Sequence, residues 1–96
     1  MNSLIIYSTT DGQTKKICEV IRDSSINKNS YEILSLDDAF NKKIENYNEI
    51  IIGASIRYGR HSSKVYKFIQ NNKNILNKIK SAFFSVNVVA RKPEKN

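Results

Sequence analysis

The sequence has 96 residues, a length that suits one small domain with little core to spare. Its formal charge is +7, from 16 lysines and arginines against 9 aspartates and glutamates, and the basic residues are spread along the chain. Such a spread is typical of a solvated surface, or of a protein that meets an anionic ligand, nucleic acid or membrane. The single cysteine, Cys18, excludes an internal disulfide and a cysteine-based metal cluster, so we predict no metal site and a reducing compartment.

The first half of the chain predicts two strands and a helix. The N-terminal apolar run, residues 4–7, is too short for a signal peptide or a membrane span, which predicts a cytoplasmic chain. This run suits a strand buried on both faces. From Thr14 apolar residues recur at helical spacing, and Cys18 is interpreted as a packing residue of that helix. "YEILSL", residues 31–36, predicts a second strand at a sheet edge.

The second half predicts two more strands and another helix. Residues 37–48 predict only a short helix or an irregular link, whereas "EIIIGASI", residues 49–56, predicts a strand because β-branched isoleucines favour one. Ser62 or Ser63 can cap a helix whose apolar positions recur up to Leu76. "SAFFSVNVVA", residues 81–90, predicts a fourth strand, and the tail "RKPEKN" predicts a loop or frayed end.

Alternating strands and helices predict a single α/β domain over residues 1–96, with a parallel sheet sandwiched by helices. Right-handed crossovers place the carboxyl ends of the strands at one edge of the sheet. Ligands of such sheets bind at that edge. The loops that follow the strands are therefore the places to look for a site.

The loop after the first strand, "YSTTDGQT", combines hydroxyl side chains, one glycine and a helix start. Because its glycine stands alone, it matches neither of the glycine-rich nucleotide-binding patterns. Backbone N–H groups and the helix dipole favour a bound phosphate there, and Gly12 permits a conformation or a close approach that a side chain would forbid. The alternative is that threonine and aspartate side chains simply cap the helix. The candidate phosphate residues are Ser8, Thr9, Thr10, Asp11, Gly12, Gln13 and Thr14.

Two further loops lie at the same predicted edge. "GASIRYGRHS" brings Tyr58, whose ring can stack on a flat ligand, and two arginines that can meet a carboxylate. "NVVARKP" brings Asn87, which can read the edge of a ring. Each of these features alone is more typical of an ordinary surface, and His61 is interpreted as incidental.

Three motifs, "YSTTDGQT", "IGASIRYG" and "SVNVVARKPEK", occur in an order that resembles the quinone-dependent protoporphyrinogen IX dehydrogenases of bacteria, which are flavodoxin-like proteins. The resemblance implies a flavodoxin-like sheet of order 2-1-3-4-5 and bound FMN. It also implies oxidation of protoporphyrinogen IX to protoporphyrin IX in haem biosynthesis, with electrons passed to a membrane quinone, menaquinone or ubiquinone.

The same resemblance implies a position for each part of the cofactor. Thr9 to Thr14 would hold the phosphate, and Ser55 and Tyr58 would lie beside the isoalloxazine. No protein acid or base is implied, because the flavin itself carries the redox chemistry. The residues that would line the other side of the ring are Ser85, Val86, Asn87, Val88 and Val89.

Members of that family continue well beyond the "ARKPEK" motif, with a fifth strand and further helices, whereas this sequence stops at Asn96. We therefore expect the order 2-1-3-4, with the fourth strand at an exposed edge. Uncovered apolar surface would then favour association, either as a homo-oligomer or with a second chain that completes the sheet.

Several functions remain open at this point. They are the FMN enzyme, a small FMN-binding electron-transfer module and a truncated, non-catalytic remnant. The positive charge favours contact with porphyrin carboxylates or lipid headgroups, which is compatible with peripheral contact at the inner face of the cell membrane. Nucleic-acid binding is disfavoured because the sequence has no recognised motif and no aromatic platform.

Overall fold

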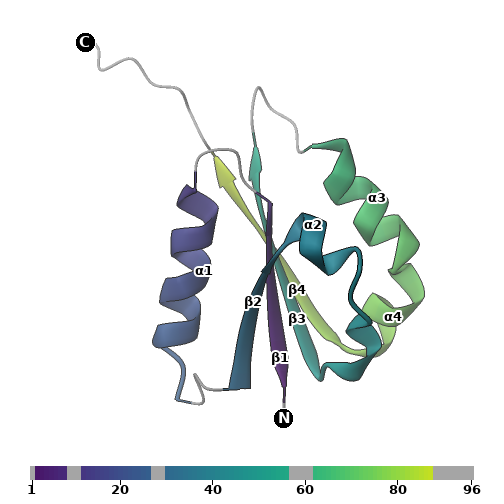
Figure 1. Ribbon diagram of the computed structural model, residues 1–96, viewed down its shortest axis with the longest axis horizontal. Coiled ribbons are helices and arrows are strands. Elements are labelled where there is room, and N and C mark those ends of the chain that lie inside the picture. Colours follow the sequence, from purple (N-terminus) through teal and green to yellow (C-terminus); the bar gives the residue numbers. More distant parts are fainter. Residues whose placement is uncertain (1, 9–11, 27–29, 57–61, 88–96) are drawn as a thin grey trace.

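Figure 1 shows the protein as a computed structural model, in which a parallel sheet lies between two layers of helices. The structure describes residues 2–8, 12–26, 30–56 and 62–87. The strands are β1 (Ser3–Ser8), β2 (Tyr31–Ser35), β3 (Glu49–Ile56) and β4 (Lys80–Asn87). The helices are α1 (Gln13–Asp23), α2 (Leu36–Ala39), α3 (Ser63–Asn71) and α4 (Lys73–Lys78), with a 3-10 turn, η2 (Ile44–Asn46).

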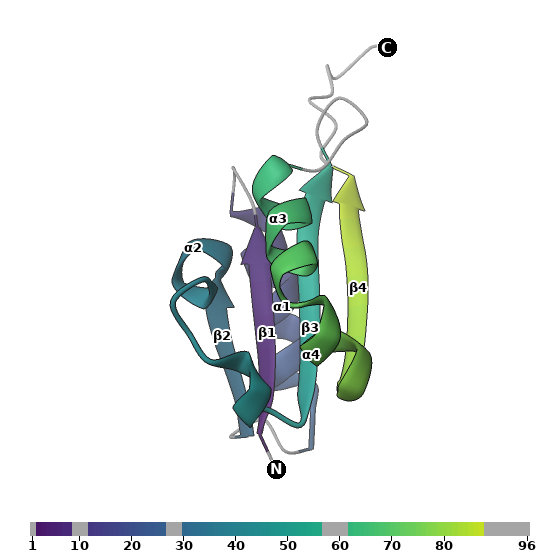
Figure 2. The same ribbon diagram turned by 90° about the vertical axis from the view of Figure 1, so that its right-hand side faces the viewer.

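The sheet has the order β2-β1-β3-β4, and all neighbouring strands are parallel. The predicted strand order and fold class are therefore confirmed, with β4 at one edge of the described sheet. Helix α1 covers one face, and α2, α3 and α4 cover the other (Figures 1 and 2). Because every strand runs in the same direction, the ends of β1, β3 and β4 meet at one edge, as predicted for the site.

The main core lies between the sheet and the layer of α2, α3 and α4. Alternate residues of β1 and β3 face this layer, so that Leu4 and Ile52 pack in one cluster with Val65 and Phe68 of α3. The ring of Phe68 meets that of Phe40 edge to face, with ring centroids 5.3 Å apart. Residues 3–6 of β1 are buried, as expected for a central parallel strand.

The segment of residues 36–48 contributes more to the core than the sequence predicted. It contains α2 and η2, and its apolar side chains join the main core cluster. Their uneven spacing follows no helical or strand period, which is why the pattern indicated only a link. Ser35 caps α2, since its hydroxyl oxygen accepts the backbone N–H of Asp38 at 3.1 Å. The buried residues are Leu36, Ala39, Ile44 and Tyr47.

The helix predicted after Ser62 is divided into α3 and α4. Asn72 leaves helical geometry, with φ −114° and ψ 19°, and its side-chain amide donates to the carbonyl of Phe68 at 2.9 Å. Ser62 occupies the N-cap position of α3, but its hydroxyl makes no capping hydrogen bond, so the predicted cap is wrong in that respect. Among the helices of the described ranges, none is long and apolar enough to cross a membrane.

Candidate functional site

The carboxyl ends of three strands are side by side at the predicted edge. Ser8 of β1 pairs with Ala54 of β3, which in turn pairs with Ser85 of β4. The hydroxyl of Ser55 donates to the carbonyl of Ser8 at 3.3 Å and so ties the end of β1 to that of β3. The structure thus brings together residues from three motifs that are far apart in the sequence.

The predicted residues of β4 divide between the two faces of the sheet. Val86 pairs with Ser55, and both lie on the face that α1 covers, because their neighbours Ala54 and Ile52 face the main core. Ser85 pairs with Ala54 and lies on the face of α3. A ligand at this edge would therefore meet Ser85 and Val86 from different sides.

Gly12 shapes the turn that leads into α1. Its backbone has φ 84°, which is left-handed, and its carbonyl accepts the N–H of Lys16 at 3.2 Å. A Cβ placed on Gly12 would have no neighbour within 4 Å. The left-handed backbone thus confirms the conformational reason predicted for this glycine, and the close approach stays a prediction.

Thr14, in the first turn of α1, carries an unsatisfied hydroxyl. The residue is fully buried, and within the residues that the structure describes its Oγ1 has no hydrogen-bond partner. A buried polar atom without a partner typically costs about 1–3 kcal/mol. The N-cap of α1 is Gly12, with no side-chain cap, so the interpretation of Thr14 as a capping residue is wrong. The hydroxyl of Thr14 is thus buried at the start of α1 without a partner among the described residues.

The first turn of α1 is electrostatically unusual. It contains Lys15 and Lys16 and no acidic residue, although the positive end of a helix dipole favours acidic side chains. The ammonium of Lys15 lies 5.9 Å from the ring centroid of Tyr7, within the range of a cation–π contact. These two lysines were not among the predicted site residues. Their position at a helix start is the sequence feature that could have drawn attention to them. The turn therefore presents positive charge beside Thr14.

Gly53 of β3 and Phe84 of β4 are in close contact one residue before the pair Ala54 and Ser85. They pair in the ladder, and a Cβ on Gly53 would overlap the ring of Phe84. The ring thus occupies the place where a side chain would stand. The sequence could not predict this contact, since Phe84 lies 31 positions away from Gly53 along the chain.

Cys18, one turn beyond Thr14, takes no part in nucleophilic chemistry. It is fully buried, which confirms its predicted packing role. Burial raises the pKa of its thiol to about 11, and the neighbouring carboxylate of Glu19 adds to the rise. The thiol is therefore protonated at neutral pH, the form that is a poor nucleophile.

A cavity of about 320 Å³ lies next to the end of β1, on the side of α2 and α3. An ion pair between Lys64 and Asp37, 3.2 Å long, forms part of its wall. The carboxyl edge is thus hollowed beside Ser8. Its lining residues are Tyr7, Ser8, Ser35, Leu36, Asp37, Ser62 and Lys64.

Several predicted site residues lie outside the described residues, so their positions stay predictions. The side chain of Asn87, at the end of β4, is likewise not described. The residues concerned are Thr9, Thr10, Asp11, Tyr58, Val88 and Val89. In the described ranges, no group of three or more histidine, cysteine, aspartate or glutamate residues could hold a metal ion.

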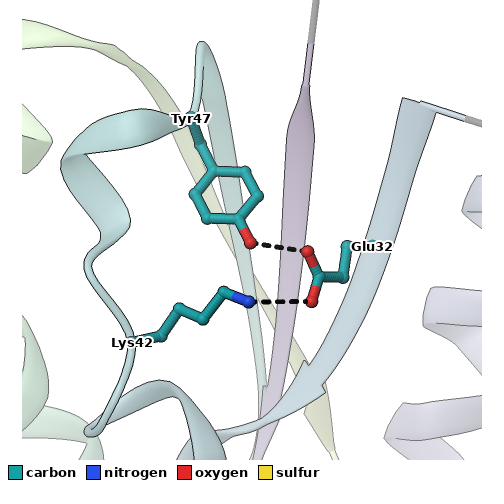
Figure 3. Close-up of polar contacts among 3 residues, drawn as sticks. All are labelled: Glu32, Lys42 and Tyr47. Atoms are coloured by element: carbon teal, nitrogen blue, oxygen red, sulfur yellow. Dashed lines mark hydrogen bonds and ion pairs between the residues drawn. The ribbon is translucent and has the colours of Figure 1, made fainter.

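A second polar cluster lies at the opposite, amino end of the sheet (Figure 3). The hydroxyl of Tyr47 donates to the carboxylate of Glu32 at 2.5 Å, and the ammonium of Lys42 lies 3.3 Å from the same carboxylate. These contacts lower the pKa of Glu32, the bond from Tyr47 most of all. Burial, followed by the bond to Glu32, raises the pKa of Tyr47. The cluster connects residues 40–48 to β2, and the polar groups of its three side chains bond to one another.

The chain matches the flavodoxin domain family over residues 4–96. It is 39% identical over 99 residues to the protoporphyrinogen IX dehydrogenase [quinone] of Escherichia coli strain K12, covering 99% of this chain and 53% of that protein. It is 36% identical over 95 residues to the protein of the same name from Leishmania major, covering 97% of this chain and 41% of that one. The chain thus spans about half the length of the curated relatives it matches.

A solved structure shares the fold. It is that of a flavoprotein in complex with FMN from Lactobacillus acidophilus NCFM, which superposes with a TM-score of 0.67 at 20% sequence identity. The superposition covers 91% of this chain and 75% of that one. The strand order, the loop-to-helix turn at the end of β1 and the family match agree with one another: the chain belongs to the flavodoxin domain family.

Proposed function

We propose that the chain binds FMN at the carboxyl edge of its sheet and takes part in the oxidation of protoporphyrinogen IX, with a quinone as electron acceptor. The names of the curated relatives support the substrate and the acceptor. The structural neighbour was solved in complex with FMN, which supports the cofactor. A cytoplasmic location, and the place of this reaction in haem biosynthesis, belong to the same proposal.

The unsatisfied hydroxyl of Thr14 is the observation that carries FMN binding. A terminal phosphate would accept a hydrogen bond from this buried group, and the positive end of the helix dipole would favour it at the start of α1. The positive charge of Lys15 and Lys16 would stabilise the dianion. The residues present therefore fit a phosphomonoester, and the left-handed Gly12 turns the chain into the helix at that point.

The remaining residues would position the ring system. When bound, FMN supplies the redox chemistry. Ser55 holds the ends of β1 and β3 together, and Val86 lies beside it on the same face, so the two strands offer a fixed edge. We assign Tyr58 and residues 88–89 to the flanks of the ring. Basic residues near this edge, such as Lys64, would attract the carboxylates of the porphyrinogen.

Fluorescence titration of the purified chain with FMN and with riboflavin tests the assignment. We expect the fluorescence of FMN to be quenched on binding, with a defined stoichiometry. Riboflavin, which lacks the phosphate, should bind much more weakly. Thr14→Val should weaken FMN binding by about tenfold, since a hydrogen bond to a charged group contributes about 1.5–3 kcal/mol, and should leave riboflavin binding unchanged. Thr14→Ser keeps the hydroxyl and is the matched control. Equal binding of both ligands would overturn the phosphate site.

The fold shared with a flavoprotein solved in complex with FMN supports a second candidate, a small FMN-binding module that exchanges electrons without oxidising the porphyrinogen. Anaerobic assay of the FMN-loaded chain with protoporphyrinogen IX and a quinone separates the two. Porphyrin formation that depends on the quinone supports the enzyme. FMN binding without porphyrin formation supports the module, and a folded chain that binds no FMN leaves the non-catalytic remnant.

A further inference from the structure

The cavity of about 320 Å³ beside the end of β1 lies on the opposite face of the sheet from the assigned phosphate. Thr14 belongs to α1, whereas the cavity is lined from α2 and α3, which cover the other face. Figure 2 shows these two helices in front of the sheet. Because Leu4 and Ile6 face this layer, strand alternation turns Ser8 toward it as well. The phosphate assigned to α1 therefore does not account for this cavity, which we name the α2–α3 cavity.

An ion pair joins the two helices at this cavity. The ammonium of Lys64 on α3 lies 3.2 Å from the carboxylate of Asp37 on α2, and the two side chains are 64% and 72% exposed. An exposed pair of this kind contributes little to stability, so its partners exchange readily. Lys64 also lies in the first turn of α3, where the positive end of the helix dipole disfavours a cation. Lys64 is therefore a positive charge that an anionic ligand can take over from Asp37.

Hydroxyl groups complete the wall of the cavity. The hydroxyl oxygen of Ser35 accepts the N–H of Asp38, which leaves its O–H able to donate. Ser62 lines the cavity and makes no capping hydrogen bond, and Ser8 lines it from the end of β1. The buried side chain of Leu36 adds an apolar part. Hydroxyl donors beside a cation, with an apolar wall, suit a carboxylate that is carried on a short aliphatic arm.

We propose that the α2–α3 cavity binds a carboxylate arm of the substrate, with Lys64 as the group that pairs with it and Asp37 as the group that it displaces. This inference rests on the proposed function, since the carboxylate would belong to protoporphyrinogen IX. FMN has no carboxylate and its phosphate is assigned to the other face, so the group comes from the second reactant. The volume suits one arm and not a whole tetrapyrrole, which would stay at the sheet edge where the flavin is assigned.

Binding of protoporphyrin IX and of its dimethyl ester to the full chain without FMN tests the proposal. Both ligands are kept in the same neutral detergent, and binding is followed by porphyrin absorbance. The ester keeps the macrocycle and loses the negative charges. We expect the free acid to bind about fivefold more tightly, and to lose this advantage between about 0.1 M and about 1 M salt, because exposed charges are then screened. Equal binding of the acid and the ester at low salt would overturn the proposal.

Two substitutions with effects of opposite sign locate the site. Lys64→Gln should weaken binding of the free acid about fivefold, whereas Asp37→Asn, which removes the competing carboxylate, should strengthen it about threefold. Neither should change binding of the ester. Lys67→Gln and Asp38→Asn are the matched controls, because both side chains are exposed and lie outside the wall of the cavity. Controls as effective as Lys64→Gln and Asp37→Asn, or weaker binding by Asp37→Asn, would contradict the location.

The same measurements separate this inference from the cofactor assignment. A chain that binds FMN but does not distinguish the acid from the ester would keep the phosphate site and overturn the carboxylate cavity. A chain that distinguishes them through Lys64 but binds no FMN would support the cavity and overturn the proposed function.

Steady-state kinetics of the FMN-loaded chain give a second readout. Lys64→Gln should raise KM for protoporphyrinogen IX and leave kcat unchanged, since a group remote from the reacting atoms binds the substrate and the transition state equally. FMN affinity should stay that of the wild type, because α1 and its first turn are unaltered. A lower kcat at unchanged KM would refute the assignment of Lys64 as a substrate-binding group.

Discussion

The two ends of the sheet differ in the hydrogen bonding of their buried polar groups. At the amino end, Tyr47 bonds to Glu32, Ser3 donates to Glu49 at 3.1 Å, and Asn2 donates to the side-chain carbonyl of Asn48 at 3.0 Å. At the carboxyl end, the buried hydroxyl of Thr14 has no partner within the described part of the chain. The hydroxyl of Ser55 at the carboxyl end is bonded within the protein too, so among the described residues Thr14 is the exception.

This difference separates structural polar groups from groups reserved for a ligand. A network whose members bond one another stabilises the fold and leaves no capacity for a substrate. A buried hydroxyl that lacks a partner lowers the stability of the free protein. A ligand that bonds to this hydroxyl restores the lost stability when it binds. By this criterion the amino-end cluster is structural, although a cavity of about 280 Å³ lies beside it.

The largest expected effect on stability comes from a substitution at Gly53, which lies between the two ends of the sheet. Gly53→Ala should lower the free energy of unfolding by about 2 kcal/mol, because its Cβ would displace the ring of Phe84 and separate β3 from β4. Urea unfolding measures the loss. The double variant Gly53→Ala with Phe84→Leu removes the outer ring atoms and should recover part of it. A single variant as stable as the wild type would contradict the packing described here.

Tyr47→Phe tests the amino end. It should lower the free energy of unfolding by about 1–2 kcal/mol, because the carboxylate of Glu32 loses the hydrogen bond that most lowers its pKa. We expect the smaller values of that range, since the side chain of Glu32 is 44% exposed and water replaces part of the lost bond. FMN binding should be unchanged. Weaker FMN binding at equal stability would place this cluster in the functional site.

Gly12→Ala tests the backbone of the carboxyl end. It should cost about 1 kcal/mol of stability, because a left-handed conformation is unfavourable for a residue with a Cβ although the surrounding space is open. Gly12→Asn should cost less, since asparagine tolerates this conformation. If alanine and asparagine are equally tolerated, as judged by urea midpoints, the left-handed turn is not what constrains this position.

The smallest expected effect is a pH dependence of the amino-end cluster. The pKa of Glu32 is lower in the folded protein, so its contribution is present above its ordinary pKa and is lost as the pH falls through the folded value. The pKa of Tyr47 is raised, so its contribution is present below its ordinary pKa and is lost as the pH rises through the folded value. The stability difference between wild type and Tyr47→Phe should therefore shrink at both extremes of pH. A difference that stays constant from acid to alkaline pH would contradict this.

Local pattern was sufficient for most of the fold. A continuous apolar run located β1, β-branched isoleucines located β3, and helical spacing located α1, because these signals come from neighbours in the chain. The break at Asn72 was not predicted, since the apolar spacing continues through it and the bond from its side chain to Phe68 is a feature of the folded backbone. Likewise, the pairing of Tyr47 with Glu32 spans 15 residues and has no sequence signature.

The sheet edge that carries the candidate site was predictable, but the contacts of its residues were not. Strand ends in a parallel sheet meet at one edge, so the sequence was enough to bring Ser8, Ser55 and Ser85 together. The sequence could not decide whether Thr14 caps the helix or bonds to a ligand, because a threonine at this position suits both roles. In the structure, Thr14 makes no capping hydrogen bond, and its buried Oγ1 without a described partner supports the proposed ligand role.

Two hydroxyl groups, those of Thr14 and Tyr47, have opposite roles, and one paired measurement tests this most directly. The free energy of urea unfolding should be compared for Thr14→Val and Tyr47→Phe against the wild type, without ligand. We predict that Thr14→Val leaves the free protein as stable as the wild type or raises its stability, since valine fills the same space without a buried polar atom, whereas Tyr47→Phe destabilises it. A loss of more than about 1 kcal/mol for Thr14→Val would mean that its hydroxyl is already bonded within the protein, and the phosphate site would lose its main support.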